Sequence, residues 1–155
     1  MSKILVGLLV PNSHELVAGA TNILGEVLRK ATKKVIRDGS LTVIEAEESR
    51  LPNEQAAELL NERSDISFAA WIVPLAQVEG EETIFMIVVS LLRRNELLIE
   101  VSTPVLRLTP AIYKEKGIIS DVYSLLTGGA VSQNEAIALA YRIALGRMLQ
   151  GVKYN

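Results

Sequence analysis

The chain has 155 residues, of which 49% are hydrophobic and 22% charged, and its formal net charge at pH 7 is −2. This length and composition predict a single domain over residues 1–155 that buries roughly 70% of its unfolded surface. The near-neutral charge gives no overall field that would collect nucleic acid or an anionic membrane. Cysteine is absent and histidine occurs once, which excludes disulfides, thiolate metal sites and any site that needs two imidazoles.

The N-terminal part of the chain predicts strands that alternate with helices. Its first apolar run, Ile4–Val10, stops at Pro11 and is typical of a buried parallel strand, not of a signal sequence. Ser13 is placed to cap a long helix that ends near Gly39. A second strand and a short helix follow, at Leu41–Ala46 and from Pro52 to about Arg63. No apolar run reaches the roughly 20 residues that span a bilayer, so we expect a cytoplasmic protein without a membrane span.

The middle of the chain predicts three consecutive strands. The run Thr83–Leu92 is almost entirely apolar, which is typical of a strand at the centre of a sheet that is covered on both faces. Its β-branched residues favour a strand, although Glu81-Glu82 before it and Arg93-Arg94 after it would also suit a helix dipole. The preceding strand is expected at Ile66–Val73, closed by Pro74.

The third of these strands, Leu97–Leu108, alternates between apolar and polar residues. We expect one face to hold Leu97, Ile99, Val101, Thr103 and Val105, and the other to hold Glu100, Ser102 and Pro104. Polar residues and a proline on one face indicate an edge strand with one side toward water.

Two helices are predicted at the C-terminal end. One starts at Thr109, breaks near Gly117 and ends near Leu126, and the last opens with a capping box at Ser132–Glu135 and runs to about Leu149. The order β-α-β-α-β-β-β-α-α predicts an α/β fold with an α+β tendency. We expect a single mixed five-stranded sheet, two parallel crossovers followed by an antiparallel meander, and helices on both faces.

This order of elements resembles the N-terminal domain of TolB and its relative LpoB. The resemblance rests on the strand ISFAAWIV, the hairpin TIFMIVVSLL–RRNE–LLIEVSTPVL and the alanine-rich closing helix NEAIALAYRIALGRML, and it covers most of the chain. It implies a role in protein binding or assembly without catalysis. It transfers no functional residue, because no functional motif aligns.

Polar residues at the ends of the first two strands form one candidate site. Ligands in open α/β sheets gather beyond the carboxyl ends of strands, beside helix N-termini. The candidates are Asn12, Ser13, His14 and Glu15 after the first strand, and Glu45, with Glu47 and Glu48, at the second. His14 could act as a base or contact an anion, and the carboxylates could hold a hard cation. The alternative is a Ser13 helix cap with solvated neighbours; no cofactor or metal is predicted.

Basic residues at the end of the first predicted helix form a second candidate. They follow i, i+4, i+8 spacing and comprise Arg29, Lys30, Lys33, Lys34 and Arg37. Such a face could contact phosphates of nucleic acid or of lipid headgroups. Its position at a helix C-terminus explains it without a ligand, and no aromatic residues are interleaved, so nucleic acid is not expected.

Two functional hypotheses follow. The first is a non-enzymatic protein-interaction or assembly module that forms a homo-oligomer, with another protein as a possible partner. Three strands are apolar on both faces, and if the helices fall short on one face, a second copy of the chain could complete the cover. The second is a small-ligand enzyme or sensor that uses the crevice at the ends of the first two strands. The first is preferred because no nucleophile, base and orienting group occur together, and no catalytic residue is predicted.

Overall fold

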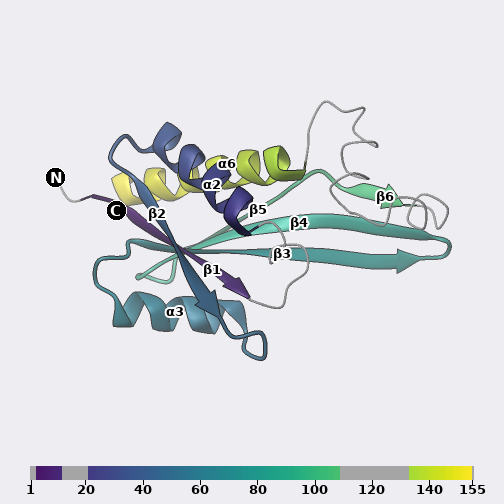
Figure 1. The fold of residues 1–155 in the computed structure, drawn as a ribbon, viewed down its shortest axis with the longest axis horizontal. Helices are drawn as coiled ribbons and strands as arrows, with labels where there is room; N and C mark the ends of the chain where they lie inside the picture. The colour runs from purple at the N-terminus through teal and green to yellow at the C-terminus, as the bar shows by residue number, and fades with distance from the viewer. Residues whose placement is uncertain (1–2, 12–20, 109–132, 155) are drawn as a thin grey trace.

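A computed structural model of the protein describes residues 3–11, 21–108 and 133–154. A mixed sheet forms its centre, in the order β2-β1-β3-β4-β5, with β6 also paired to β4 (Figure 1). The strands are β1 (Leu5–Pro11), β2 (Ser40–Ala46), β3 (Phe68–Glu79), β4 (Glu82–Arg93), β5 (Leu98–Ser102) and β6 (Leu106–Leu108). β1 runs parallel to β2 and β3, whereas β4 runs antiparallel to β3, β5 and β6. The predicted α/β class, parallel crossovers and antiparallel meander are confirmed.

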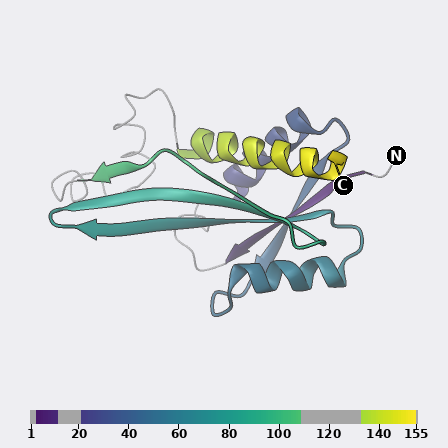
Figure 2. The same cartoon turned by 180° about the vertical axis from the view of Figure 1, so that it is seen from behind.

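Helices cover both faces of the sheet, as predicted. α2 (Thr21–Val35) and α6 (Gln133–Tyr154) lie side by side on one face, and α3 (Pro52–Glu62) lies on the other (Figures 1 and 2). Among the described helices, none is both long and apolar enough to cross a membrane. The helix predicted from Thr109 to Leu126 and the cap predicted at Ser13 lie outside the described residues.

The face under α2 and α6 holds the larger core. Alternate residues of β4 point into it, and Phe85, Ile87, Val89 and Leu91 are all buried there. The two helices are also joined by a buried hydrogen bond of 2.7 Å between the hydroxyls of Tyr141 and Thr32. Because the Thr32 hydroxyl donates to the Leu28 carbonyl at 2.7 Å, the phenol is the donor toward Thr32. Burial raises the pKa of Tyr141 to about 12.

The face under α3 holds a smaller core. It contains Leu9, Ala56, Leu59, Leu60, Ile66, Ala69 and Trp71. Gly7 lets α3 approach the sheet, since a Cβ there would lie 3.1 Å from side-chain atoms of Ile66 and Leu59. Arg94, in the turn after β4, donates to the carbonyls of Leu60 (3.1 Å) and Arg63 (2.7 Å) at the end of α3. This cation ties the helix C-terminus to the sheet.

β3 and β4 form a long hairpin that extends beyond α3, which we call the arm (Figures 1 and 2). The prediction that Pro74 ends β3 was wrong: the strand continues to Glu79 and turns at Gly80, which has a φ of 62°. The proline is tolerated because β1 pairs with β3 only as far as Trp71, so Pro74 lies on an open edge.

The expectation that β4 is covered on both faces holds only in part. On the face toward α2 and α6, its residues are buried along most of the strand. On the α3 face, Ser90 is buried but Ile84, Met86 and Val88 are only half-buried. α3 has 11 residues and is about 16 Å long, whereas the 12 residues of β4 extend over about 40 Å. One short helix therefore cannot cover the whole strand.

The fifth predicted strand is divided into β5 and β6 by a bulge. Val88 pairs with Ser102 and Phe85 pairs with Leu106, so three residues of one strand oppose two of β4. Thr103 fills the break, because its hydroxyl accepts the Ile87 N–H at 3.0 Å. The prediction that Val105 shares the face of Thr103 was wrong: the extra residue leaves Val105 53% exposed and buries Leu106 instead.

Candidate functional site

A pocket of about 210 Å³ lies where β1 and β2 end and α3 begins, beside the middle of β3. The sequence predicted a crevice at this edge of the sheet, beyond the carboxyl ends of the first two strands. The pocket is largely apolar, and its lining includes Leu9, Pro11, Pro52, Trp71 and Val73. Trp71 is the only tryptophan of the chain and is buried in the wall.

The residues predicted for this crevice are brought together only in part. Glu47 and Glu48 line the pocket, but Glu45 does not: it is exposed within β2, where it pairs with Val10. Asn12, Ser13, His14 and Glu15 lie outside the described residues. The loop after β2 and the start of α3 therefore supply the polar part of the pocket lining, and β1 and β3 supply much of its apolar wall.

Gln55 holds that loop in place. Its side-chain amide donates to the carbonyls of Glu47 (2.7 Å) and Arg50 (3.2 Å), and its carbonyl oxygen accepts the Glu47 N–H at 2.8 Å. Arg50 in turn pairs with Glu58, and this guanidinium lowers the pKa of the Glu58 carboxyl. Gln55 was not predicted from the sequence. The only sign of its role there is that it is a polar residue next to Ala56, which faces inward. These polar groups are used to build the pocket, so its apolar wall is the part left to contact a ligand.

The α3 face of the arm continues outward from this pocket. We define the arm face as the apolar residues of β3 and β4 that point to this side beyond α3: Val73, Leu75, Ile84, Met86 and Val88. Gln77 and, at the tip, Glu79 and Glu82 point to the same side. Val73 pairs with Val88 and Leu75 pairs with Met86, so these four side chains form a compact apolar patch. Leu75 is 42% exposed and the other members are half-buried. Val73 also lines the pocket, so pocket and arm face form one continuous apolar surface.

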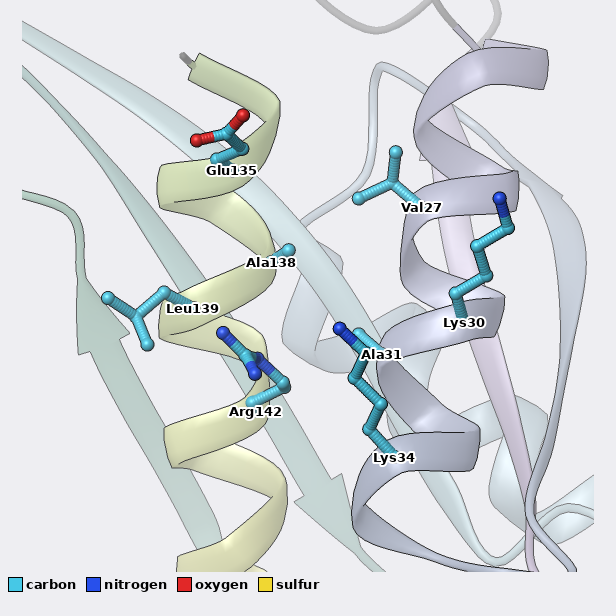
Figure 3. A pocket seen from close by; sticks show the side chains of 8 residues that line it. All are labelled: Val27, Lys30, Ala31, Lys34, Glu135, Ala138, Leu139 and Arg142. Carbon is cyan, nitrogen blue, oxygen red and sulfur yellow. The ribbon is translucent and has the colours of Figure 1, made fainter. Parts of the chain in front are cut away.

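The basic residues predicted as a second site are all exposed, on two sides of the C-terminal half of α2 and in the turn after it. Arg29 turns toward β2, pairing with Glu26 at 3.1 Å and donating to the Leu41 carbonyl at 3.4 Å. Lys30 and Lys34 line a groove between α2 and α6 (Figure 3). Lys33 is exposed and does not line this groove. Arg37 lies in the turn, beyond the end of the helix.

The groove between α2 and α6 has a volume of about 360 Å³ and an apolar floor of Val27, Ala31 and Ala138. Leu139 also lines it, and its side chain points away from α2 in Figure 3. α6 adds Glu135 and a further cation, Arg142. The sequence analysis did not single out Arg142, because only the packing of α6 against α2 places it beside two lysines. Within the described ranges, no three histidine, aspartate or glutamate side chains converge as a metal site would need.

The chain matches no protein-family model, and none of the curated proteins compared with it is a match. The resemblance to the TolB and LpoB domains therefore stays a prediction, and the function has to be argued from the geometry of the chain itself.

Proposed function

We propose that the protein is a non-catalytic interaction and assembly module that associates with a second copy of itself through the arm face. The observation that carries this proposal is the uncovered apolar patch around Leu75 and Met86. Contiguous apolar surface on a soluble protein marks a site of contact, because leaving it in water is costly. Here it lies on a regular sheet face, which packs well against another sheet face.

A second copy suits this face because the arm is self-complementary. A two-fold axis through the middle of the patch runs two arms antiparallel, so each apolar stripe meets its equivalent. The carboxylates at the tip (Glu79, Glu81 and Glu82) then approach the start of α3 in the other copy. Arg50 and the N–H groups at the start of α3 attract these carboxylates, but Glu47, Glu48 and Glu54 oppose them, so the apolar patch and not the charge at its ends supplies the contact.

Face-to-face stacking is favoured over pairing of strand edges. The open edge of β3 beyond Trp71 contains Pro74, which has no N–H to donate to an added strand. The charged tip also disfavours edge pairing. Two copies joined along the β3 edge would bring their tip glutamates together without burying apolar surface. The side chains of the arm face, and not the backbone of the edge, therefore supply the contact.

Sedimentation velocity over the micromolar range tests the proposal. We expect the wild-type chain to form a dimer, and Leu75→Glu or Met86→Glu to shift it to monomer, because each places a carboxylate at the centre of the stacked patch. Val78→Glu is the matched control: Val78 lies on the same arm, is 74% exposed and points to the opposite face. A monomeric wild type, or equal behaviour of the Leu75 and Val78 variants, contradicts the proposal.

A second candidate function, binding of a small ligand, is favoured by the position of the 210 Å³ pocket at the carboxyl ends of the parallel strands β1 and β2. Because Trp71 is the only tryptophan and lines this pocket, its emission reports occupancy directly. Titration with nucleotides, sugar phosphates and small aromatic acids should shift that emission and raise the melting temperature if the pocket binds one of them. Ligands that leave both signals unchanged count against this function.

A further inference from the structure

We infer that the face formed by α2 and α6 binds the surface of a membrane rich in anionic phospholipids, with a lipid phosphate seated in the groove between the two helices. This inference concerns the side of the molecule opposite the arm face and does not depend on self-association. It rests on three observations: an excess of positive charge, a cationic groove with an apolar floor, and exposed aliphatic side chains among the cations.

The charge of the molecule is unevenly distributed. Residues 21–39 and 133–150, which comprise α2, the turn after it and most of α6, carry seven cations and three carboxylates. The whole chain carries 16 lysines and arginines against 18 aspartates and glutamates. The near-neutral total therefore hides a positive helix layer, and the excess negative charge lies in the rest of the chain. A layer of this kind attracts an anionic surface even though the whole chain does not.

The groove supplies a place for a phosphate. Lys30 and Lys34 come from α2 and Arg142 from α6, and Figure 3 shows the ammonium of Lys34 reaching toward α6. The ion pairs found among the described residues do not involve any of these three cations. In Figure 3 the carboxylate of Glu135, at the end of the groove, points away from Arg142. In Figure 3 the ammonium of Lys30 points along α2 and away from Arg142, so Lys34 and Arg142 are the pair placed to hold a headgroup phosphate beside the apolar floor, and Lys30 adds positive charge nearby.

Two aliphatic side chains stand among these cations. Leu139 is 49% exposed and Ile143 is 39% exposed, and they lie one turn apart on the outer face of α6. Leu139 also lines the groove, so a headgroup held there lies next to this apolar pair. Exposed aliphatic residues beside basic ones are the pattern by which a helix rests in the boundary between headgroups and acyl chains.

Other anionic partners fit the surface less well. Nucleic acid would use the cations, but it would gain nothing from Leu139 and Ile143, and the described part of α2 and α6 offers no exposed aromatic side chain on which bases could stack. An acidic peptide would fill the groove, yet Lys33, Arg37 and Arg147 lie outside it and would stay unused. A broad anionic surface engages the groove, the surrounding cations and the aliphatic pair together.

Co-sedimentation with large unilamellar vesicles tests this inference. We expect the full chain to bind phosphatidylcholine vesicles that contain about 30 mol% phosphatidylglycerol at least tenfold more tightly than pure phosphatidylcholine, and to be released by salt. The double variant Lys30→Glu/Lys34→Glu should lose at least about tenfold of that binding, since each cation near an anionic surface contributes about fivefold. Lys30→Gln/Lys34→Gln should lose less, in proportion to the smaller change in charge.

A matched control uses two cations outside the helix layer. Arg93→Glu/Arg107→Glu makes the same change in net charge, but these residues lie in β4 and β6, so vesicle binding should fall much less. Leu139→Ser/Ile143→Ser should weaken binding severalfold while leaving its salt dependence unchanged, because no charge is altered. Circular dichroism verifies that each variant is folded.

Three outcomes would overturn the inference. One is equal binding to zwitterionic and anionic vesicles, and another is an equal loss in the lysine and arginine double variants. The third is tight binding of a double-stranded DNA fragment that survives Leu139→Ser/Ile143→Ser, with weak binding to vesicles, which would assign the face to nucleic acid. Sedimentation of the same variants without lipid keeps this test separate from self-association, since Leu75→Glu should remain able to bind vesicles.

Discussion

The two faces of the sheet differ in how much of their apolar surface the helices cover, and β4 shows the difference within one strand. Its odd-numbered residues from Phe85 to Leu91 are buried under the helix layer, whereas Ile84, Met86 and Val88 on the α3 face are only half-buried. The strand is apolar on both faces, so the difference comes from the helices. α6 has 22 residues and is about 33 Å long, about twice the length of α3. The length of a covering helix thus decides which apolar surface is core and which is left for a partner.

The largest expected effect compares one leucine from each core. Leu145 of α6 is fully buried in the larger core, and Leu60 of α3 is buried in the smaller one. We expect Leu145→Ala to cost about 4 kcal/mol and Leu60→Ala about 2 kcal/mol, because the smaller core beside an open surface can relax around the missing atoms. Urea unfolding at one protein concentration measures both. Equal costs would mean that the two faces are packed equally well and that the α3 face has no greater freedom to relax.

A second prediction concerns the link between α3 and the sheet. Arg94→Met keeps most of the side-chain length but removes the hydrogen bonds to the carbonyls of Leu60 and Arg63. We expect this substitution to lower the unfolding free energy by about 1–2 kcal/mol, because it removes charge-assisted hydrogen bonds at a helix C-terminus. Arg93→Met is the control, because the Arg93 guanidinium bonds only to the nearby Asn95 side chain among the described residues and should matter less. If both variants lose the same amount, Arg94 does not anchor α3.

A third prediction tests the hydrogen bond within the helix layer. Tyr141→Phe should cost about 1 kcal/mol at neutral pH, because it removes the bond to Thr32 while Thr32 keeps its bond to the Leu28 carbonyl. Its folded pKa of about 12 lies above the ordinary value of 10.0, so the unfolded chain ionises first as pH rises. The contribution of this group is constant below pH 10 and falls between pH 10 and 12, by about 1.4 kcal/mol per pH unit.

Absorbance at alkaline pH checks this ionisation directly. One of the four tyrosines should ionise well after an exposed phenol does, and Tyr141→Phe should remove that late phase. The unfolding free energy of the variant should also fall less than that of the wild type between pH 10 and 12, because the ionisation of Tyr141 no longer contributes. A titration in which the variant keeps the late phase would show that another tyrosine is the buried one.

Much of the fold follows from patterns that are local in the sequence. Continuous apolar runs located β1, β3 and β4, and the proline at its N-terminal end located α3. The errors arise where a neighbouring strand decides the outcome. Proline usually ends a strand because it removes a ladder hydrogen bond, but Pro74 loses nothing where β1 has already ended. Likewise, the bulge at Thr103 depends on its bond to Ile87, which lies on another strand.

The site was less predictable for the same reason. Strand order places the pocket at the predicted edge of the sheet, but which carboxylates face it depends on the loop that Gln55 holds. Glu45 and Glu47 lie two residues apart, and only Glu47 lines the pocket. The basic residues of α2 were visible in the sequence, whereas their association with Arg142 needed the packing of two helices that are distant in the chain.

The smallest expected effect compares the turns at the two ends of β4. Each turn has a residue in the left-handed region: Gly80 (φ 62°) at the tip of the arm and Glu96 (φ 66°) near the end of α3. A non-glycine residue costs about 1–2 kcal/mol there, whereas glycine costs conformational entropy in the unfolded chain. We therefore expect Glu96→Gly to stabilise the chain by about 0.5 kcal/mol and Gly80→Ala to destabilise it by a similar amount.

Urea unfolding of the two variants measures both effects. Glu96 lies in the turn that carries Arg94 to α3, so relief of its strain should raise the unfolding free energy of the chain. Gly80 is far from α3, and a Cβ there would meet no atom within 4 Å, so only backbone strain can act. Loss of stability in Glu96→Gly would show that the Glu96 side chain makes a contact worth more than the strain it imposes.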